Sequence, residues 1–199
     1  MSAPTLHIII SSTRPGRLGP SVARWFHRFA TEHGGFDAKL VDLADFELPV
    51  FDESNHPMMQ QYEHEHTRRW SASVDAADAY VFVMPEYNFN PPPAFVNALD
   101  YLHKEWNYKP AGFVNYSIGP TGGIRAGQAA KLLVTTMKMM PMLEGVMVPL
   151  VNNLIDEDGV FHSNELIDNS AQTLLDELLR WACGLNAIRT ENFRALQAA

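Results

Sequence analysis

Short apolar runs alternate with longer amphipathic stretches along the chain. Leu6–Ile10 is apolar with one exception, and Ala79–Met84 is apolar throughout. This is the pattern of strands that are buried on both faces of a sheet. Between these runs, Ser21–His33 carries apolar side chains at helical spacing and is followed by two glycines, as is typical of a helix C-terminus. The N-terminal part is therefore predicted to contain buried strands with a helix between them.

The same alternation continues along the rest of the chain. Ala44–His64 is rich in turn residues and is predicted to be a long surface loop. Five strands alternating with five helices indicate an α/β fold with a five-stranded parallel sheet and helices on both faces. A length of 199 residues suits a single domain covering 1–199. The further strands are predicted at Phe36–Leu43, Ala111–Tyr116 and Gly145–Leu150, the further helices at His66–Ala77, Pro92–Lys104, Gly123–Met139 and Asn164–Cys183, and a frayed helical tail at Thr190–Ala199.

In such sheets ligands bind at the carboxyl ends of the strands, so the loops after the first, third and fourth strands are the candidate sites. The first loop, Ser11–Ser21, contains four hydroxyls, two glycines and two arginines and leads into a helix. Unpaired N–H groups at a helix N-terminus and arginine side chains favour an anion. The loop is therefore predicted to bind a phosphate, the alternative being a polar turn with Ser21 as N-cap. The residues expected to hold the phosphate are Ser12, Thr13, Arg14, Arg17 and Ser21, with backbone N–H groups near Gly19 and Val22.

The other two loops have features that suit a planar aromatic ligand. Pro85–Pro93 combines rigid backbone, aromatic rings and amides, although its prolines also explain a simple turn into a helix. Ser117–Arg125 is rich in glycine and opens a helix, which fits either close approach to a ligand or a flexible connection. The residues expected around the ring are Pro85, Glu86, Tyr87 and Asn88 on one side and Ser117, Gly119, Gly122 and Gly123 on the other.

Signatures that the chain lacks narrow the choice of phosphate compound. The first loop has neither the Gly-x-Gly-x-x-Gly of dinucleotide folds nor the Gly-x-x-x-x-Gly-Lys-Ser/Thr of nucleotide triphosphatases. Asp42 ends the second strand, where dinucleotide folds keep an acid for the ribose. Without the glycine signature, Asp42 is interpreted as a solvated acid at a strand end.

Charge and composition restrict the partners and the compartment. With 15 Lys and Arg against 23 Asp and Glu the net charge is −8, which disfavours nucleic acids and anionic membranes. No apolar run approaches the ~20 residues of a membrane span, and no signal peptide is visible, so a cytoplasmic location is expected. Cys183 is expected to be a buried filler of the last helix. His64 and His66 are expected on different helix faces, solvated and without a shared metal.

These loops resemble those of the NADPH-dependent FMN reductase family, which includes bacterial chromate, azo-dye and quinone reductases. The similarity extends from about Leu6 to Leu150, with two departures: Ser11 replaces the usual first glycine, and Pro15–Gly19 extends the phosphate loop. Ser11–Arg14 resembles the family's phosphate-loop opening, Pro85–Asn88 with Asn97–Leu102 its most specific signature, Leu48–Phe51 its Leu-Pro-x-Phe/Tyr segment, and Gly122–Arg125 its third loop.

The resemblance implies a flavodoxin-like three-layer sandwich with strand order 2-1-3-4-5, bound FMN, and NAD(P)H as co-substrate. It implies hydride transfer from the nicotinamide to the flavin and onward to a small acceptor, which is a quinone, an azo compound, chromate or free flavin, in a ping-pong cycle. Because the flavin carries this chemistry, no catalytic side chain is assigned. A homodimer or homotetramer is also implied, with Phe95, Leu99, Tyr101 and Trp106 either at its contact surface or in the core.

Other functions fit the sequence less well. A non-enzymatic flavodoxin, which carries electrons between protein partners, is the main alternative. A phospho-signalling receiver domain would need a phosphoacceptor Asp at the end of the third strand, where this chain has Pro85–Tyr87. A structural or interaction module would not need three ligand-type loops.

Overall fold

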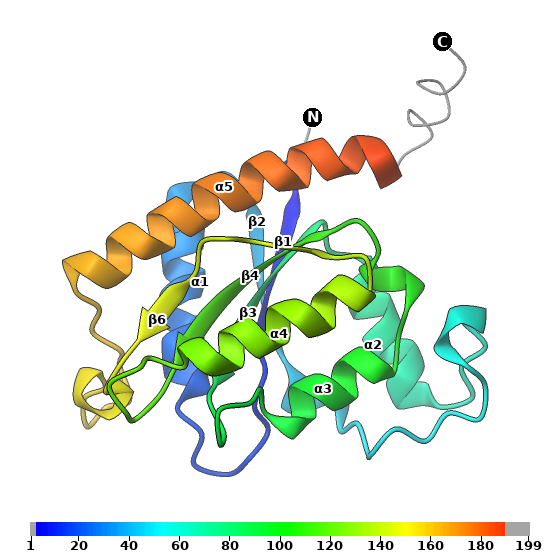
Figure 1. The fold of residues 1–199 in the computed structure, drawn as a ribbon, viewed down its shortest axis with the longest axis horizontal. Helices are drawn as coiled ribbons and strands as arrows, with labels where there is room; N and C mark the ends of the chain where they lie inside the picture. Colours follow the sequence, from blue (N-terminus) through cyan, green and yellow to red (C-terminus); the bar gives the residue numbers. More distant parts are fainter. Residues whose placement is uncertain (1–2, 190–199) are drawn as a thin grey trace.

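A parallel sheet forms the middle layer of the protein, for which the computed structural model describes residues 3–189 (Figure 1). The strand order is β2-β1-β3-β4, with β5 and β6 both paired to β4. This order confirms the predicted flavodoxin-like topology. The strands are β1 (Thr5–Ile10), β2 (Asp37–Asp42), β3 (Ala79–Pro85), β4 (Pro110–Tyr116), β5 (Met140–Pro141) and β6 (Val146–Val148).

The fifth position of the sheet differs from the prediction of one continuous strand. β5 pairs with the start of β4, and β6 pairs with its end. Between them, residues 142–145 leave the regular ladder. The hydrogen bonds to β4 continue past Pro141, since the N–H groups of Met140 and Met142 donate to the carbonyl oxygens of Lys109 and Ala111 at 3.1 and 2.9 Å, and the ladder breaks after Met142. The predicted strand Gly145–Leu150 therefore corresponds to β6 alone.

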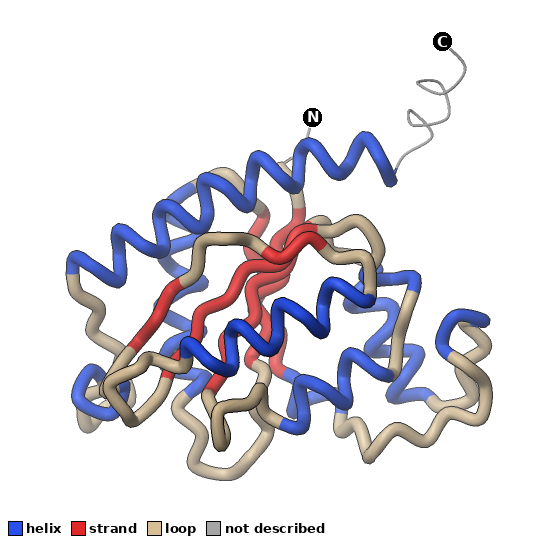
Figure 2. The backbone as a smooth tube through the Cα atoms, in the orientation of Figure 1, coloured by secondary structure: helices blue, strands red, loops and turns tan. Residues whose placement is uncertain are grey.

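Helices cover both faces of the sheet (Figure 2). The side chains of α1 and α5 share one hydrophobic core with β1, β3 and β4, and those of α2, α3 and α4 share a second core on the other face. The helices are α1 (Gly19–His33), α2 (Glu65–Asp75), α3 (Pro93–Asp100), α4 (Ile124–Thr136) and α5 (Glu165–Arg189), and the 3-10 helices are η1 (Leu43–Phe46), η2 (Pro57–Met59), η3 (Lys104–Trp106) and η4 (Val151–Leu154).

Several boundaries and burials correct the sequence-based expectations. The predicted surface loop Ala44–His64 contains part of η1 and all of η2, and α5 continues to Arg189. Cys183 was expected to be buried, but it is exposed, because it lies on the outer face of α5. The predicted tail Thr190–Ala199 lies outside the described residues. For four apolar residues the sequence did not distinguish between a subunit interface and the core. In the structure all four are buried in the core: Phe95, Leu99, Tyr101 and Trp106.

Candidate functional site

Three loops that are distant in the sequence line one cavity at the carboxyl ends of β1, β3 and β4. The cavity measures about 250 Å³. Parallel strands present their carboxyl ends at the same edge of a sheet, which is why these loops meet. The lining consists of Arg14, Arg17 and Leu18 from the first loop, Pro85, Glu86 and Tyr87 from the second, Tyr116, Ser117 and Ile118 from the end of β4 and the loop behind it, and Val151 from η4.

Arg17 is held by the protein itself. Its two terminal nitrogens lie 2.8 and 2.6 Å from the carboxylate oxygens of Asp42, and it also donates to the carbonyl oxygen of Ser12. Asp42 further accepts a backbone N–H of η1, so it is a paired, capping residue and not the solvated acid expected. This bidentate pair compensates the charge of Arg17. Arg14 is exposed and lies with its guanidinium 5.9 Å from the centre of the Tyr87 ring.

The first turn of α1 begins beside this loop. Its N-cap residue, Leu18, makes no side-chain cap hydrogen bond, and the N–H of Ser21 donates to the carbonyl oxygen of Leu18 at 3.1 Å. The hydroxyls of Ser12 and Tyr116 lie 3.4 Å apart, and a Cβ at Gly19 would come within 2.8 Å of the Tyr116 hydroxyl. Burial raises the pKa of Tyr116 to about 12, so its hydroxyl keeps its proton at neutral pH. The positive end of a helix dipole near Arg14 fits the phosphate expected from the sequence.

A tight turn carries the aromatic residues of the second loop. Tyr87 and Asn90 exchange two backbone hydrogen bonds of 3.0 and 2.9 Å. Asn88 and Phe89 between them have φ values of 51° and 68°, as in a type I′ turn. Outside glycine, such left-handed backbone costs of order 1–3 kcal/mol per residue. The turn leaves Phe89 exposed at the rim and places Tyr87 on the cavity wall.

Glu86 borders the cavity, but its carboxylate caps α4. One carboxylate oxygen accepts the backbone N–H groups of Arg125 and Ala126 at 3.0 and 3.1 Å, and the side chain is only 8 % exposed. The guanidinium of Arg125 lies 4.2 Å from the centre of the Phe89 ring. The sequence led us to expect Glu86 beside a ring, whereas its charged atoms join the second loop to the third.

Glycines shape the third loop. Gly122 and Gly123 have φ values of 61° and 77°, which side chains other than glycine adopt at a cost. A Cβ at Gly123 would lie 3.0 Å from the backbone of Tyr116, so this glycine packs against β4. The hydroxyl of Ser117 donates to the carbonyl oxygen of Gly119 at 2.9 Å. These contacts hold the loop in place at the end of β4.

The structure brings only some of the predicted site residues to the cavity. Ser21 lies inside α1, where its hydroxyl accepts from Arg24 at 3.3 Å. Val22 is fully buried, and its N–H is bonded to the carbonyl oxygen of Leu18. Both are displaced from the loop because α1 begins two residues earlier than predicted. The predicted residues that line the cavity are Arg14, Arg17, Pro85, Glu86, Tyr87 and Ser117; Ser12 and Gly19 pack against Tyr116, Asn88 is exposed on the turn, and Thr13 faces a larger cavity.

Four lining residues were missed by the sequence analysis. Tyr116 carried a detectable signal, because it is the last residue of a predicted buried strand and hence lies at the ligand-binding edge. Leu18 and Ile118 are apolar residues within polar loops and carried none. Val151 follows the fifth strand, whose loop was not a candidate.

Comparison with known proteins identifies the family. Residues 4–153 match the NADPH-dependent FMN reductase family. The chain belongs to this family. It is 35% identical to an NAD(P)H-dependent FMN reductase of Schizosaccharomyces pombe over 171 residues, covering 82% of this chain and 85% of that protein. It is 26% identical to a quinone reductase of Pseudomonas putida, covering 87% and 92% of the two chains.

The fold has a close relative among solved structures. A flavoenzyme NAD(P)H:acceptor oxidoreductase of Paracoccus denitrificans superposes with a TM-score of 0.72 at 20% identity, covering 90% of this chain and 97% of that one. Membership of the FMN reductase family confirms the expected oxidoreductase class and the use of FMN with a reduced nicotinamide. Within residues 3–189, no helix is both long and apolar enough to cross a bilayer.

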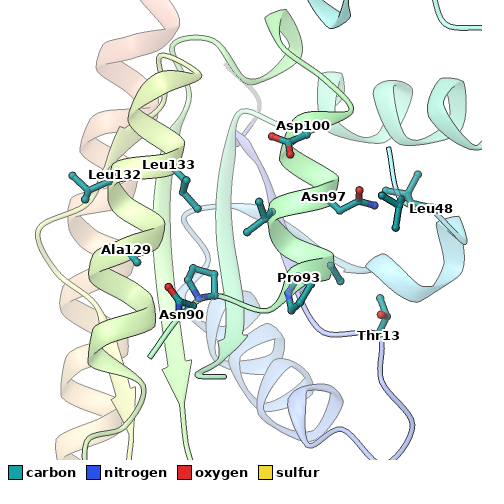
Figure 3. Close-up of a pocket in the computed structure, with 13 residues that line it drawn as sticks. Thr13, Leu48, Asn90, Pro93, Asn97, Asp100, Ala129, Leu132 and Leu133 are labelled. Atoms are coloured by element: carbon teal, nitrogen blue, oxygen red, sulfur yellow. The ribbon is translucent and has the colours of Figure 1, made fainter. Parts of the chain in front are cut away.

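A larger cavity of this FMN reductase family member lies apart from the one where the three loops meet. It measures about 890 Å³ and lies between α3, α4 and the Leu48–Val50 segment (Figure 3). Its walls are mostly apolar, and the side chains of Leu132 and Val50 are 75% and 87% exposed. Thr13 and Asn90 connect it to the first and second loops. We assign the ligand site to the smaller cavity, because the polar and charged groups converge there.

The histidine pair does not lie as the sequence suggested. The rings of His64 and His66 are stacked 5.1 Å apart, because His64 precedes α2 and is not part of it. Both imidazoles face Asp52, at 3.8 and 3.3 Å. Across the described part of the chain, no group of three or more His, Cys, Asp or Glu side chains is arranged to hold a metal ion.

Proposed function

We propose that this protein is an FMN-dependent NAD(P)H oxidoreductase that reduces a small acceptor, namely a quinone, an azo compound, chromate or free flavin. The observation that carries the proposal is the 250 Å³ cavity at the sheet edge, where the three loops predicted to bind FMN come together in a member of the FMN reductase family. The quinone reductase of Pseudomonas putida among the relatives supports a quinone as the first acceptor to test.

In this proposal each part of the cavity has a distinct role. The N-terminus of α1 and the exposed guanidinium of Arg14 hold the phosphate, while Arg17, fixed by Asp42, shapes the loop around it. Tyr87 and Ser117, which line the cavity from the second and third loops, would contact the ring. When bound, FMN supplies the hydride-transfer chemistry, and the protein supplies binding and orientation.

We further propose that the protein is a homodimer formed through the large cavity between α3 and α4. Leu132 and Val50 expose apolar surface there, and apolar patches of this kind mark interaction sites. Because Thr13 lines this cavity and belongs to the first loop, a second copy seated in it would lie beside the flavin phosphate.

The proposed activity is tested on the purified protein. FMN should be released on denaturation, and NADPH or NADH should be oxidised in the presence of a quinone without any added reductase. A protein that takes up no FMN would overturn the proposal. FMN binding with no NAD(P)H oxidation would favour the electron-carrier alternative, because a flavodoxin needs a separate reductase.

The phosphate role of Arg14 gives a sharper prediction. Arg14→Ala should weaken FMN roughly 10- to 100-fold, the value of a hydrogen bond to a charged group, and should leave riboflavin affinity nearly unchanged, because riboflavin has no phosphate. Arg28→Ala, which changes an exposed arginine farther along α1, is the matched control. Fluorescence titration with both flavins measures the ratio, and equal losses for both ligands would contradict the role.

A further inference from the structure

Glu86 connects two loops that border the proposed flavin cavity, through both its side chain and its backbone. Its carboxylate accepts the first N–H groups of α4, from Arg125 and Ala126, at 3.0 and 3.1 Å. Its own backbone N–H donates to the carbonyl oxygen of Tyr116 at 3.1 Å. The residue therefore binds the third loop at both ends, once where it leaves β4 and once where it enters α4.

The hydrogen bonds between the Glu86 carboxylate and α4 are stronger than those between neutral groups, because the acceptor is charged. A carboxylate at a helix N-terminus accepts N–H groups that would otherwise be unpaired and interacts favourably with the helix dipole. The side chain is 8% exposed, so water competes little for these bonds. Local sequence does not reveal this contact, because Glu86 and Arg125 in the first turn of α4 are separated by 39 residues along the chain.

The turn that follows Glu86 needs such support. Asn88 and Phe89 both adopt left-handed backbone, a conformation that persists only when its surroundings hold it. Glu86 fixes the turn on its N-terminal side, and the guanidinium of Arg125 covers the Phe89 ring at 4.2 Å. Tyr87, on the cavity wall, lies between these two anchors.

We propose that Glu86 is a positioning residue for the flavin ring: by capping α4, its carboxylate holds the second and third loops at the separation that the ring requires. This inference rests on the proposed FMN site. Because Glu86 acts on the loops around the ring and not on the phosphate loop, its loss affects every flavin alike, which distinguishes it from Arg14.

The test compares Glu86→Ala and Glu86→Gln with Asn164→Ala. Asn164 also caps a helix, α5, with its side-chain oxygen 3.0 Å from the N–H of Ile167, and it does not line the cavity. We expect Glu86→Ala to weaken FMN and riboflavin by the same factor, roughly tenfold or more. Glu86→Gln keeps an acceptor oxygen without the charge and should recover part of the affinity. Asn164→Ala should lose comparable thermal stability with no change in flavin affinity.

The outcomes separate this inference from the proposed function. Equal effects of Glu86→Ala and Asn164→Ala on flavin affinity, or a loss confined to FMN, would overturn it. Amide hydrogen exchange without flavin gives an independent readout: Glu86→Ala should speed exchange at Arg125, Ala126 and the Tyr87–Asn90 turn, and Asn164→Ala only at the start of α5. If the wild-type protein bound no flavin, the proposed function would fail, and unchanged exchange in Glu86→Ala would refute the link itself.

Discussion

At the scale of single residues, the two arginines of the first loop have different partners: Arg17 is paired with Asp42, and Arg14 lies beside the Tyr87 ring. Arg14 and Arg17 are three positions apart in one loop, and the sequence offers no means to tell them apart. The structure separates them, because Asp42 comes from β2, the neighbouring strand of the sheet, and takes up Arg17. Glu86 was expected beside the ring, but its carboxylate instead contacts the first turn of α4, 39 residues farther along the chain. Local sequence cannot reveal partners that only the fold brings together.

The Arg17–Asp42 pair leads to a prediction at this scale. If Arg17 shapes the loop through Asp42, then Arg17→Ala and Asp42→Asn should each weaken FMN about tenfold, and the double variant should lose little more than either single one, because both remove the same link. FMN affinities of the four proteins give the coupling free energy. A direct contact of Arg17 with the phosphate predicts a different pattern, in which Asp42→Asn leaves FMN affinity unchanged or improves it.

At the scale of elements, periodicity predicted the existence and order of the strands and helices, while their ends depended on tertiary contacts. α1 begins at Gly19 instead of Ser21, at a position where a Cβ would come within 2.8 Å of the Tyr116 hydroxyl. The fifth strand is divided, because residues 142–145 leave the regular ladder between β5 and β6. The ends of these helices and strands depend on contacts with neighbouring elements. Such contacts cannot be predicted from the sequence of one segment alone.

The end of α2 illustrates the same point and gives a prediction about pH. The ammonium group of Lys109, which is only 5% exposed, donates to the carbonyl oxygens of Val74 and Asp75 at 2.9 and 3.0 Å. Burial lowers its pKa from 10.5 to about 8. Between these two pH values the unfolded chain binds the extra proton, so the contribution of Lys109 to stability rises with pH, at up to about 1.4 kcal/mol per pH unit.

Lys109→Met removes the titratable ammonium group, and with it this pH dependence of the free energy of unfolding. We expect the free energy of unfolding of the wild-type protein to gain on that of Lys109→Met as the pH rises from 8 to about 10. Urea denaturation at closely spaced pH values measures the difference. Parallel curves for the two proteins would show that Lys109 keeps an ordinary pKa in the folded state. Exposed Lys39→Met, which changes a surface lysine, serves as the control and should leave the slope unchanged.

At the scale of the whole molecule, the first and second loops contribute residues to both cavities, so the proposed dimer would lie beside the proposed cofactor site. Thr13 belongs to the phosphate loop and also lines the large cavity between α3 and α4. The sequence indicated an oligomer only through family resemblance, and it left Phe95, Leu99, Tyr101 and Trp106 open between interface and core. All four are buried in the second core. The apolar spacing therefore predicted the side of the chain that packs toward the sheet, and it carried no information about which outer surface contacts another subunit. The prediction of a single domain over 1–199 stays a prediction.

A charge in the large cavity tests the proposed dimer. Leu132 is 75% exposed on α4 and lines this cavity, whereas Leu166 is 76% exposed on α5 and does not. We expect the wild-type protein and Leu166→Glu to sediment as dimers at micromolar concentration and Leu132→Glu to sediment as a monomer, because two copies of the new carboxylate would be buried without partners. Since exposed positions tolerate substitution, all three should unfold at similar temperatures. If Thr13 couples the two cavities, the Leu132→Glu monomer should also bind FMN more weakly than Leu166→Glu does. A Leu132→Glu dimer, or a wild-type monomer, would place the contact surface elsewhere or remove it.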